Sequence, residues 1–276
     1  MKIGDKHPVK IQGAINLSPE SFYKGSIKTK EEQILRTVDQ FITEGVDIID
    51  VGAMSTAPYL ETQISPEEET KRVVKGLELF IDKINKPVSV DTTRSETARA
   101  AIEAGGSIIN DVSGLTDDPQ IANVAAEFNV PIIIGASKIN RFSGDPTRMV
   151  ISALKSSIDL AVERGVNLDK IIIDPDIGFH RKTKYQWYEI DAHVLTHLRK
   201  LKEKLKQPIC VGVSRKSFIG HILNIEDPGE RLFGSLGATA VAIQHGANLI
   251  RTHDVRATVE TIRIIEKVRD LGQAVD

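Results

Sequence analysis

Polar and ionisable side chains stand at the end of six of the eight short apolar segments in this sequence. Asparagine and aspartate at such points are common helix caps and turn formers, so local structure explains any single one of them. Six segment ends of this kind are better explained by a shared site, because crowded polar groups without partners would destabilise the fold. The residues concerned are Asn16, Asp91, Asn110, Asp174, Lys216, Arg251 and His253.

These residues represent two kinds of chemistry. The acceptors, Asp91, Asn110 and Asp174, suit the amino and ring N–H groups of a flat nitrogen heterocycle. The donors, which include Lys216 and Arg251, suit an anion such as phosphate. A heterocycle attached to a phosphate would satisfy both groups. HExxH, Walker and GxSxG motifs are absent from the sequence, so neither a structural zinc site nor a serine hydrolase is indicated.

The apolar segments alternate without interruption with longer segments of helical periodicity. The expected strands cover residues 11–15, 47–51, 88–90, 107–109, 131–134, 171–173, 208–211 and 248–250. The expected helices cover residues 29–44, 66–84, 95–104, 118–128, 147–164, 184–205, 229–245 and 255–271. Ser65 before Pro66 is a helix start signal, and Gly45 and Gly105 are typical of residues that follow helix ends.

Eight strand–helix pairs whose strands are apolar on both faces predict an α/β fold, a parallel (β/α)8 TIM barrel. Residues 1–276 fit one such domain, because this barrel takes about 250 residues and no linker composition divides the chain. An open doubly wound sheet is the alternative, but no GxGxxG motif follows the first expected strand. In a barrel the strands' carboxyl ends share one mouth, so the polar residues would converge there.

The composition is that of a globular protein with little attraction for polyanions. Hydrophobic residues make up 41% of the chain, and 36 Lys and Arg residues nearly balance 38 Asp and Glu residues. We therefore expect neither nucleic acid nor a membrane among the partners. The single cysteine, Cys210, excludes an internal disulfide and is interpreted as a buried apolar residue. No signal peptide or transmembrane segment is indicated, so we expect a cytoplasmic protein.

Six segments resemble the dihydropteroate synthase family, in the family's order from the first strand to the last helix. They are INLSPESF (15–22), VDIIDVGAMSTAP (46–58), SVDTTRSETARAAIEAGGSIINDVSG (89–114), IIIDPDIGF (171–179), VGVSRKSFIG (211–220) and RLFGSLGATAVAIQHGANLIRTHDV (231–255). SRKSF and the final RxHDV pattern are the most specific. The resemblance implies a TIM barrel that joins 6-hydroxymethyl-7,8-dihydropterin pyrophosphate to 4-aminobenzoate, releasing pyrophosphate with the help of Mg²⁺, in folate biosynthesis.

The resemblance also implies roles for individual residues. The pterin would be held by Asp91, Asn110, Asp174 and Lys216. Of these, the expected catalytic residues are Asp91, Asp174 and Lys216. The pyrophosphate and its Mg²⁺ would be bound by Arg251, His253 and the metal ligand Asn16. The remaining expected substrate contacts are Gly212, Thr56 on the second loop, and Phe22 and Ser217 beside the arylamine. Family members are generally homodimers, so a homodimer is expected here.

Several positions depart from the family pattern. Ala57 stands where the family has a loop arginine, and Asp176 and His180 stand where it has glycine. The departures leave the arylamine open between 4-aminobenzoate and a ribofuranosyl-phosphate derivative, as in methanopterin biosynthesis. Cationic loop residues that would meet the added phosphate are Lys24, Lys138, Arg141 and Arg148. Two other classes remain: a corrinoid-type pterin-dependent methyltransferase, which has no use for the cationic cluster, and a non-catalytic pterin-binding homologue.

Overall fold

The computed structural model describes residues 2–17, 27–53, 64–136, 139, 144–180 and 186–273. Within these ranges, eight strands form one parallel sheet. The strands are β1 (Lys10–Asn16), β2 (Ile48–Gly52), β3 (Val88–Asp91), β4 (Ile108–Asp111), β5 (Ile132–Gly135), β6 (Ile171–Asp174), β7 (Cys210–Gly212) and β8 (Leu249–Thr252). Each lies within two residues of a strand expected from the sequence.

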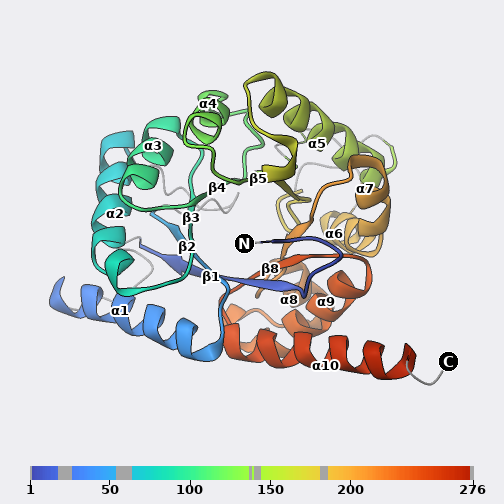
Figure 1. Ribbon diagram of the computed structural model, residues 1–276. Helices are drawn as coiled ribbons and strands as arrows, with labels where there is room; N and C mark the ends of the chain where they lie inside the picture. Colours follow the sequence, from blue (N-terminus) through green and yellow to red (C-terminus); the bar gives the residue numbers. More distant parts are fainter. Residues whose placement is uncertain are drawn as a thin grey trace.

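The sheet closes into a barrel. The strand order is β6-β5-β4-β3-β2-β1-β8-β7, so the two ends of the order are β6 and β7. A parallel bridge between Ile173 and Ile209 joins these ends, and the Ile173 N–H donates to the Pro208 carbonyl over 3.0 Å. Figure 1 shows the helices as an outer ring around the strands. The predicted (β/α)8 barrel is confirmed.

Helices follow the strands around the outside of the barrel. They are α1 (Ile27–Glu44), α2 (Pro66–Glu78), α3 (Ser95–Glu103), α4 (Gln120–Glu127), α5 (Pro146–Glu163), α6 (Trp187–Thr196), α7 (Leu198–Leu205), α8 (Ser217–Leu223), α9 (Leu232–Gln244) and α10 (Val255–Gln273). Short 3-10 turns are η2 (Ile81–Lys83), η3 (Leu168–Lys170) and η4 (Pro228–Glu230). The predicted cap at Ser65 is confirmed, because its hydroxyl accepts from the Glu68 N–H over 3.2 Å. No described helix has an apolar stretch long enough to cross a membrane.

Several helical details differ from the sequence-based expectation. The helix expected over 66–84 ends at Glu78 and is followed by the 3-10 turn η2. The single helix expected over 184–205 is divided into α6 and α7 at His197, whose φ is −117°. The Thr196 hydroxyl contacts the carbonyls of Ala192 and His193, and such back-bonding competes with the helical hydrogen bonds. The short helix α8 was not expected, because seven residues ended by the left-handed Asn224 are too few to show a helical period.

The inner face of the barrel changes from apolar to polar along the strands. At the amino-terminal end, buried residues of β2 and of β4 to β8 form an apolar cluster against which Ile3 packs: Ile48, Ile108, Ile133, Ile172, Cys210 and Leu249. Side chains two residues apart on a strand share a face. The residues two positions after Ile48, Ile108, Ile172 and Leu249 are therefore on the same inner face, namely Asp50, Asn110, Asp174 and Arg251. Cys210 is buried, as expected.

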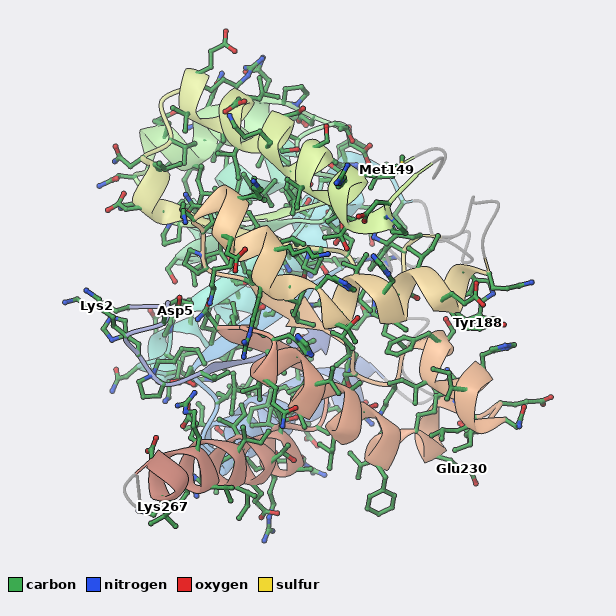
Figure 2. The ribbon with its side chains drawn as sticks, turned by 90° about the vertical axis from the view of Figure 1, so that its right-hand side faces the viewer. Lys2, Asp5, Met149, Tyr188, Glu230 and Lys267 are labelled. Carbon is green, nitrogen blue, oxygen red and sulfur yellow. The ribbon has the colours of Figure 1, made fainter. Side chains whose placement is uncertain are left out.

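The intervening strand residues face the helices. Ile49, Val90, Ile134, Ile173 and Val211 are fully buried in a second and larger cluster that includes helix side chains. Strands apolar on both faces were the basis of the barrel prediction, and this double burial is its physical reason. In Figure 2, Lys2 and Asp5 mark the amino-terminal end of the barrel, and Tyr188, near the start of α6, marks the opposite end where the strands finish.

Candidate active site at the mouth of the barrel

The predicted site residues lie at the carboxyl ends of the strands, on one mouth of the barrel. Asp91 and Asp174 are the last residues of β3 and β6, and Gly212 is the last residue of β7. Strand pairing places Asp91 beside Asn110 on one side and Gly52 on the other. The same pairing places Gly212 beside Arg251 and Gly135 beside Asp174.

A fully buried carboxylate, Asp50, is the centre of the polar network below the mouth. Its Oδ2 accepts from Arg251 Nε over 2.7 Å. Its Oδ1 accepts from Gln12 Nε2 over 3.0 Å and from Asn110 Nδ2 over 3.4 Å, and the Ser89 hydroxyl also donates to it. A buried carboxylate needs several hydrogen-bond donors, since an unpaired buried charge would cost several kcal/mol. Asp50 therefore determines where Arg251 and Asn110 lie.

Asp91 shares Arg251 with Asp50 and keeps an acceptor available. Arg251 Nη2 donates to Asp91 Oδ2 over 2.9 Å. Asp91 Oδ1 is buried, and no described residue donates a hydrogen bond to it. Burial raises the pKa of Asp91 to about 7, with Arg251 acting against the rise and Asp50 adding to it. An acceptor held without a partner at the mouth is suited to an N–H group of a ligand.

Asp174 and Lys216 form the second half of the site. Asp174 Oδ1 accepts from the Asp176 N–H over 2.8 Å, and burial raises the pKa of its carboxyl group. Lys216 precedes α8, and its Nζ lies 4.1 Å from the centre of the Phe179 ring. Burial lowers the pKa of Lys216 to about 8; Arg251 also lowers it, whereas Asp174 raises it. The lysine is thus a cation at neutral pH that titrates close to the physiological range.

An ion pair connects the two loops that carry Lys216 and His253. Arg215 Nε and Nη2 donate to the two carboxylate oxygens of Asp254 over 2.9 and 2.7 Å. His253 Nδ1 lies 3.1 Å from the Ser214 hydroxyl, and its side chain is exposed at the mouth. Because Arg215 adjoins Lys216 and Asp254 adjoins His253, this two-bonded pair sets the spacing of Lys216 and His253.

Other predicted residues are placed less fully by the described contacts. Asn16 is the half-buried last residue of β1 and pairs in register with Gly52. Ser217 begins α8 directly after Lys216. Phe22 and Thr56 lie outside the described residues. Among the residues that are described, no group of three or more His, Cys, Asp or Glu side chains could hold a metal ion.

Sequence reasoning missed Asp50 and Gln12, which organise the site. Both lie inside segments interpreted as apolar strands, 47–51 and 11–15. The available signal was a charged or amide side chain within a strand that is otherwise buried on both faces, where a hydrogen-bonding partner is needed. Arg251 was assigned to an anion alone, whereas its guanidinium also binds the carboxylates of Asp50 and Asp91.

Comparisons with known proteins agree with this geometry. The family described as "Pterin binding enzyme" matches residues 12–253. Dihydropteroate synthase of Bacillus subtilis is 34% identical over 97% of this chain and 91% of its own length, and that of Clostridium beijerinckii is 37% identical over 92% and 94%. A dihydropteroate synthase structure from Xanthomonas albilineans, with 4-aminobenzoic acid, is 32% identical, with a TM-score of 0.87 and coverage of 95% and 93%. The chain therefore belongs to the pterin-binding enzymes and, within them, to the dihydropteroate synthase family of transferases.

Proposed function

We propose that this chain joins 6-hydroxymethyl-7,8-dihydropterin pyrophosphate to the amine of 4-aminobenzoate and releases pyrophosphate. The observation that carries the proposal is the buried Oδ1 of Asp91, which has no described donor and lies in a mouth that also holds Asn110, Asp174 and Lys216. Acceptors of this kind match the N–H groups of a pterin ring. A Xanthomonas albilineans relative is solved in complex with 7,8-dihydropteroate, which combines both substrate parts.

The reaction requires a C–O bond to break and a C–N bond to form at the methylene carbon. When pyrophosphate leaves with the bonding electrons, positive charge develops on the methylene and spreads into the pterin ring. The carboxylates of Asp91 and Asp174 favour that charge, and Lys216 and Asn110 orient the ring. The arylamine nitrogen is neutral at pH 7, so it attacks without a strong base and loses its proton after the bond has formed.

The leaving group is proposed to lie toward Arg251, the exposed His253 and Asn16. Mg²⁺ takes oxygen ligands and usually combines one or two protein groups with substrate phosphates. The amide oxygen of Asn16, at the end of β1, is an oxygen ligand of this type. Asn16 would therefore hold the ion together with the pyrophosphate, and the ion would supply charge compensation for the leaving group.

The acceptor is proposed to be 4-aminobenzoate, lying beside Ser217 and, outside the described residues, Phe22 and Thr56. A phosphorylated arylamine would need cations around its phosphate. Arg148, in the first turn of α5, is the described member of the candidate set; its side chain is 87% exposed, and its Nε lies 3.8 Å from the carboxylate of Asp145. This placement favours the smaller acceptor.

A second copy of the chain is proposed to cover part of the outer helices. Helices α8, α9 and α10 expose large apolar side chains: Ile222, Leu223, Phe233, Ile264, Val268 and Leu271. Phe233 is 83% exposed, which is uncommon for a side chain of this size. Sedimentation velocity should show a dimer that Phe233→Ser weakens; a concentration-independent monomer would contradict the proposal.

The test of the activity is a pyrophosphate-release assay with the dihydropterin pyrophosphate. We expect turnover with 4-aminobenzoate and a lower kcat/KM with its ribofuranosyl-phosphate derivative, and mass spectrometry should identify dihydropteroate as the product. A preference for the phosphorylated amine would overturn the acceptor proposal. Pterin binding in calorimetry without pyrophosphate release, under conditions with added Mg²⁺, would instead indicate a non-catalytic pterin-binding homologue.

A further inference from the structure

Asp176 has a backbone conformation that a non-glycine residue rarely adopts. It lies two residues after Asp174, its φ is 54°, and its side chain is only 4% exposed. The local hydrogen bonds hold this turn: its N–H donates to Asp174 Oδ1, and its carbonyl accepts from the Phe179 N–H over 3.0 Å. A left-handed conformation with a buried carboxylate is unfavourable twice over, so the surrounding structure must enforce it.

The carboxylate of Asp176 lies on the inner side of the barrel. A Cβ added to Gly135 would lie only 2.5 Å from Asp176 Oδ2. Gly135 follows Ile133 by two residues and so faces the barrel interior, and it pairs in register with Asp174. The carboxylate therefore packs against the bare backbone of β5, at the level of the mouth.

The segment that contains Asp176 packs against Lys216. A Cβ on Gly178 would lie 2.8 Å from Lys216 Cδ, and the Phe179 ring lies 4.1 Å from Nζ. Charged and titratable groups face this lysine from several elements. Those that favour its charged form are Asp174 of β6, Asp176 of the following turn and Asp191 of α6. Those that disfavour it or interact with it are Arg251 and His253 of the β8 end and the buried His180.

We propose that Asp176 is a positioning residue of this active site, whose carboxylate keeps the Lys216 ammonium charged and directed toward the pterin. The inference rests on the proposed function, in which Lys216 contacts that substrate. Lys216 loses solvation by burial and is repelled by Arg251, and Asp174 is already engaged by the Asp176 N–H. A further carboxylate in the turn that packs against the lysine offsets both effects, which gives a physical reason for aspartate where glycine would relieve the backbone.

The test compares Asp176→Asn and Asp176→Gly with the wild type. Asparagine keeps the size of the side chain and tolerates the left-handed region, so this variant removes only the charge. Glycine removes the charge and the backbone strain together. The matched controls are Lys206→Gly, a left-handed residue after α7 with φ 59°, and Asp159→Asn, an exposed carboxylate on α5 that pairs with Lys155.

Three readouts separate positioning from a structural role. The first is the pKa of Lys216, followed by NMR of the ¹³C-methylated lysine and assigned with Lys216→Arg; it should fall in both Asp176 variants and in neither control. The second is the alkaline limb of kcat/KM, which should move down by about one pH unit and lower the rate at pH 8 about fivefold. The third is the melting temperature, which should stay within about 2 °C of the wild type or rise.

An unchanged Lys216 pKa in Asp176→Asn would overturn the proposal, as would an activity loss that simply follows a loss of melting temperature. Because the NMR titration needs no substrate, its result stands even if the proposed reaction fails. A wild-type enzyme with the expected lysine titration but no pyrophosphate release would refute the proposed function and leave only the electrostatic part of the inference.

Discussion

The two halves of the barrel interior are built by the same strands but hold opposite kinds of side chain. The amino-terminal half contains Ile48, Ile108, Ile172 and Leu249, whose burial stabilises the fold. Two residues further along the same strands stand Asp50, Asn110, Asp174 and Arg251. Burying these charges costs free energy that only close pairing offsets. The comparison shows that in these four strands a structural layer, the apolar residues, and a chemical layer, the polar residues, are two residues apart.

The free-energy cost of burying these charges is limited because two carboxylates share one cation. Arg251 binds the carboxylates of both Asp50 and Asp91, although the Asp50 network alone already includes Gln12, Ser89 and Asn110. Asp91 is the less fully satisfied partner, with its Oδ1 lacking a described donor and its pKa raised by burial to about 7. Asp50 therefore holds the chemical layer together, whereas Asp91 keeps an acceptor oxygen available for a ligand.

Removing the shared cation should have the largest effect. Arg251→Ala leaves Asp50 buried without a charged partner and exposes Asp91 to its repulsion, and breaking a buried pair from one side costs about 3–5 kcal/mol. Urea denaturation should show a loss of this size. Binding of unphosphorylated hydroxymethylpterin should weaken as well, because the position of Asp91 depends on Arg251.

The control is Arg256→Ala, which removes an exposed arginine paired with Glu260 and should change the free energy of unfolding by less than about 1 kcal/mol. If Arg251→Ala unfolds at the same urea concentration as the wild type, the stability of the chemical layer does not depend on the shared cation.

The next expected effect is on the pH dependence of stability. The folded pKa of Asp91, about 7, lies above its ordinary value of 3.8. Between these values the folded protein binds a proton that the unfolded chain does not, so this group's stabilisation is complete below about pH 4 and is lost as the pH rises through 7. Asp91→Asn cannot ionise. Its free energy of unfolding should therefore rise relative to the wild type from pH 4 to pH 8.

Urea denaturation at several pH values checks this sign. Asp111, whose pKa burial raises to about 6, and Asp174 are present in both proteins, so the difference between the curves reports Asp91 together with its interactions with Asp50 and Asp111. Parallel curves for the two proteins would mean that Asp91 ionises in the folded state as it does in the unfolded chain.

The same variant should lose activity while it gains stability at high pH. Asparagine at position 91 replaces a charged acceptor with a neutral one, and a hydrogen bond to a charged group contributes about 1.5–3 kcal/mol. We expect kcat/KM in the pyrophosphate-release assay to fall by about tenfold or more, and Asp174→Asn to behave similarly. Wild-type kcat/KM in both variants would show that these carboxylates are only turn formers.

The sequence was informative where chemistry is local to one strand end. Asp91, Asp174 and Arg251 could be singled out because each follows an apolar run, and the barrel could be predicted because eight such runs alternate with helical segments. The partnership of Arg251 with Asp50 could not be predicted. The two residues are 201 positions apart, and only closure of the sheet between β1 and both neighbours brings β8 close to β2.

The backbone conformation of single residues could not be predicted from the sequence either. Nothing in the spacing of residues 171–179 indicates that Asp176 has a positive φ, because only a small fraction of non-glycine residues adopts that region and the sequence pattern does not mark which ones do. The division between α6 and α7 is similar, since the periodicity of 184–205 is continuous and the break depends on how the Thr196 hydroxyl and His197 interact with nearby carbonyls.

The smallest expected effect tests whether the two layers are separable. Ile133 is fully buried in the amino-terminal cluster, yet it pairs in register with Asn110 of the site. Ile133→Val removes one methylene and should lower the free energy of unfolding by about 1 kcal/mol. At temperatures where the protein is folded, kcat/KM should not change, because the loss is one of packing below the site. Val162→Ala on the exposed face of α5 is the matched control and should change neither quantity. A fall in kcat/KM for Ile133→Val would show that packing in the structural layer sets the position of Asn110. The structural layer could then not be altered without changing the chemical layer.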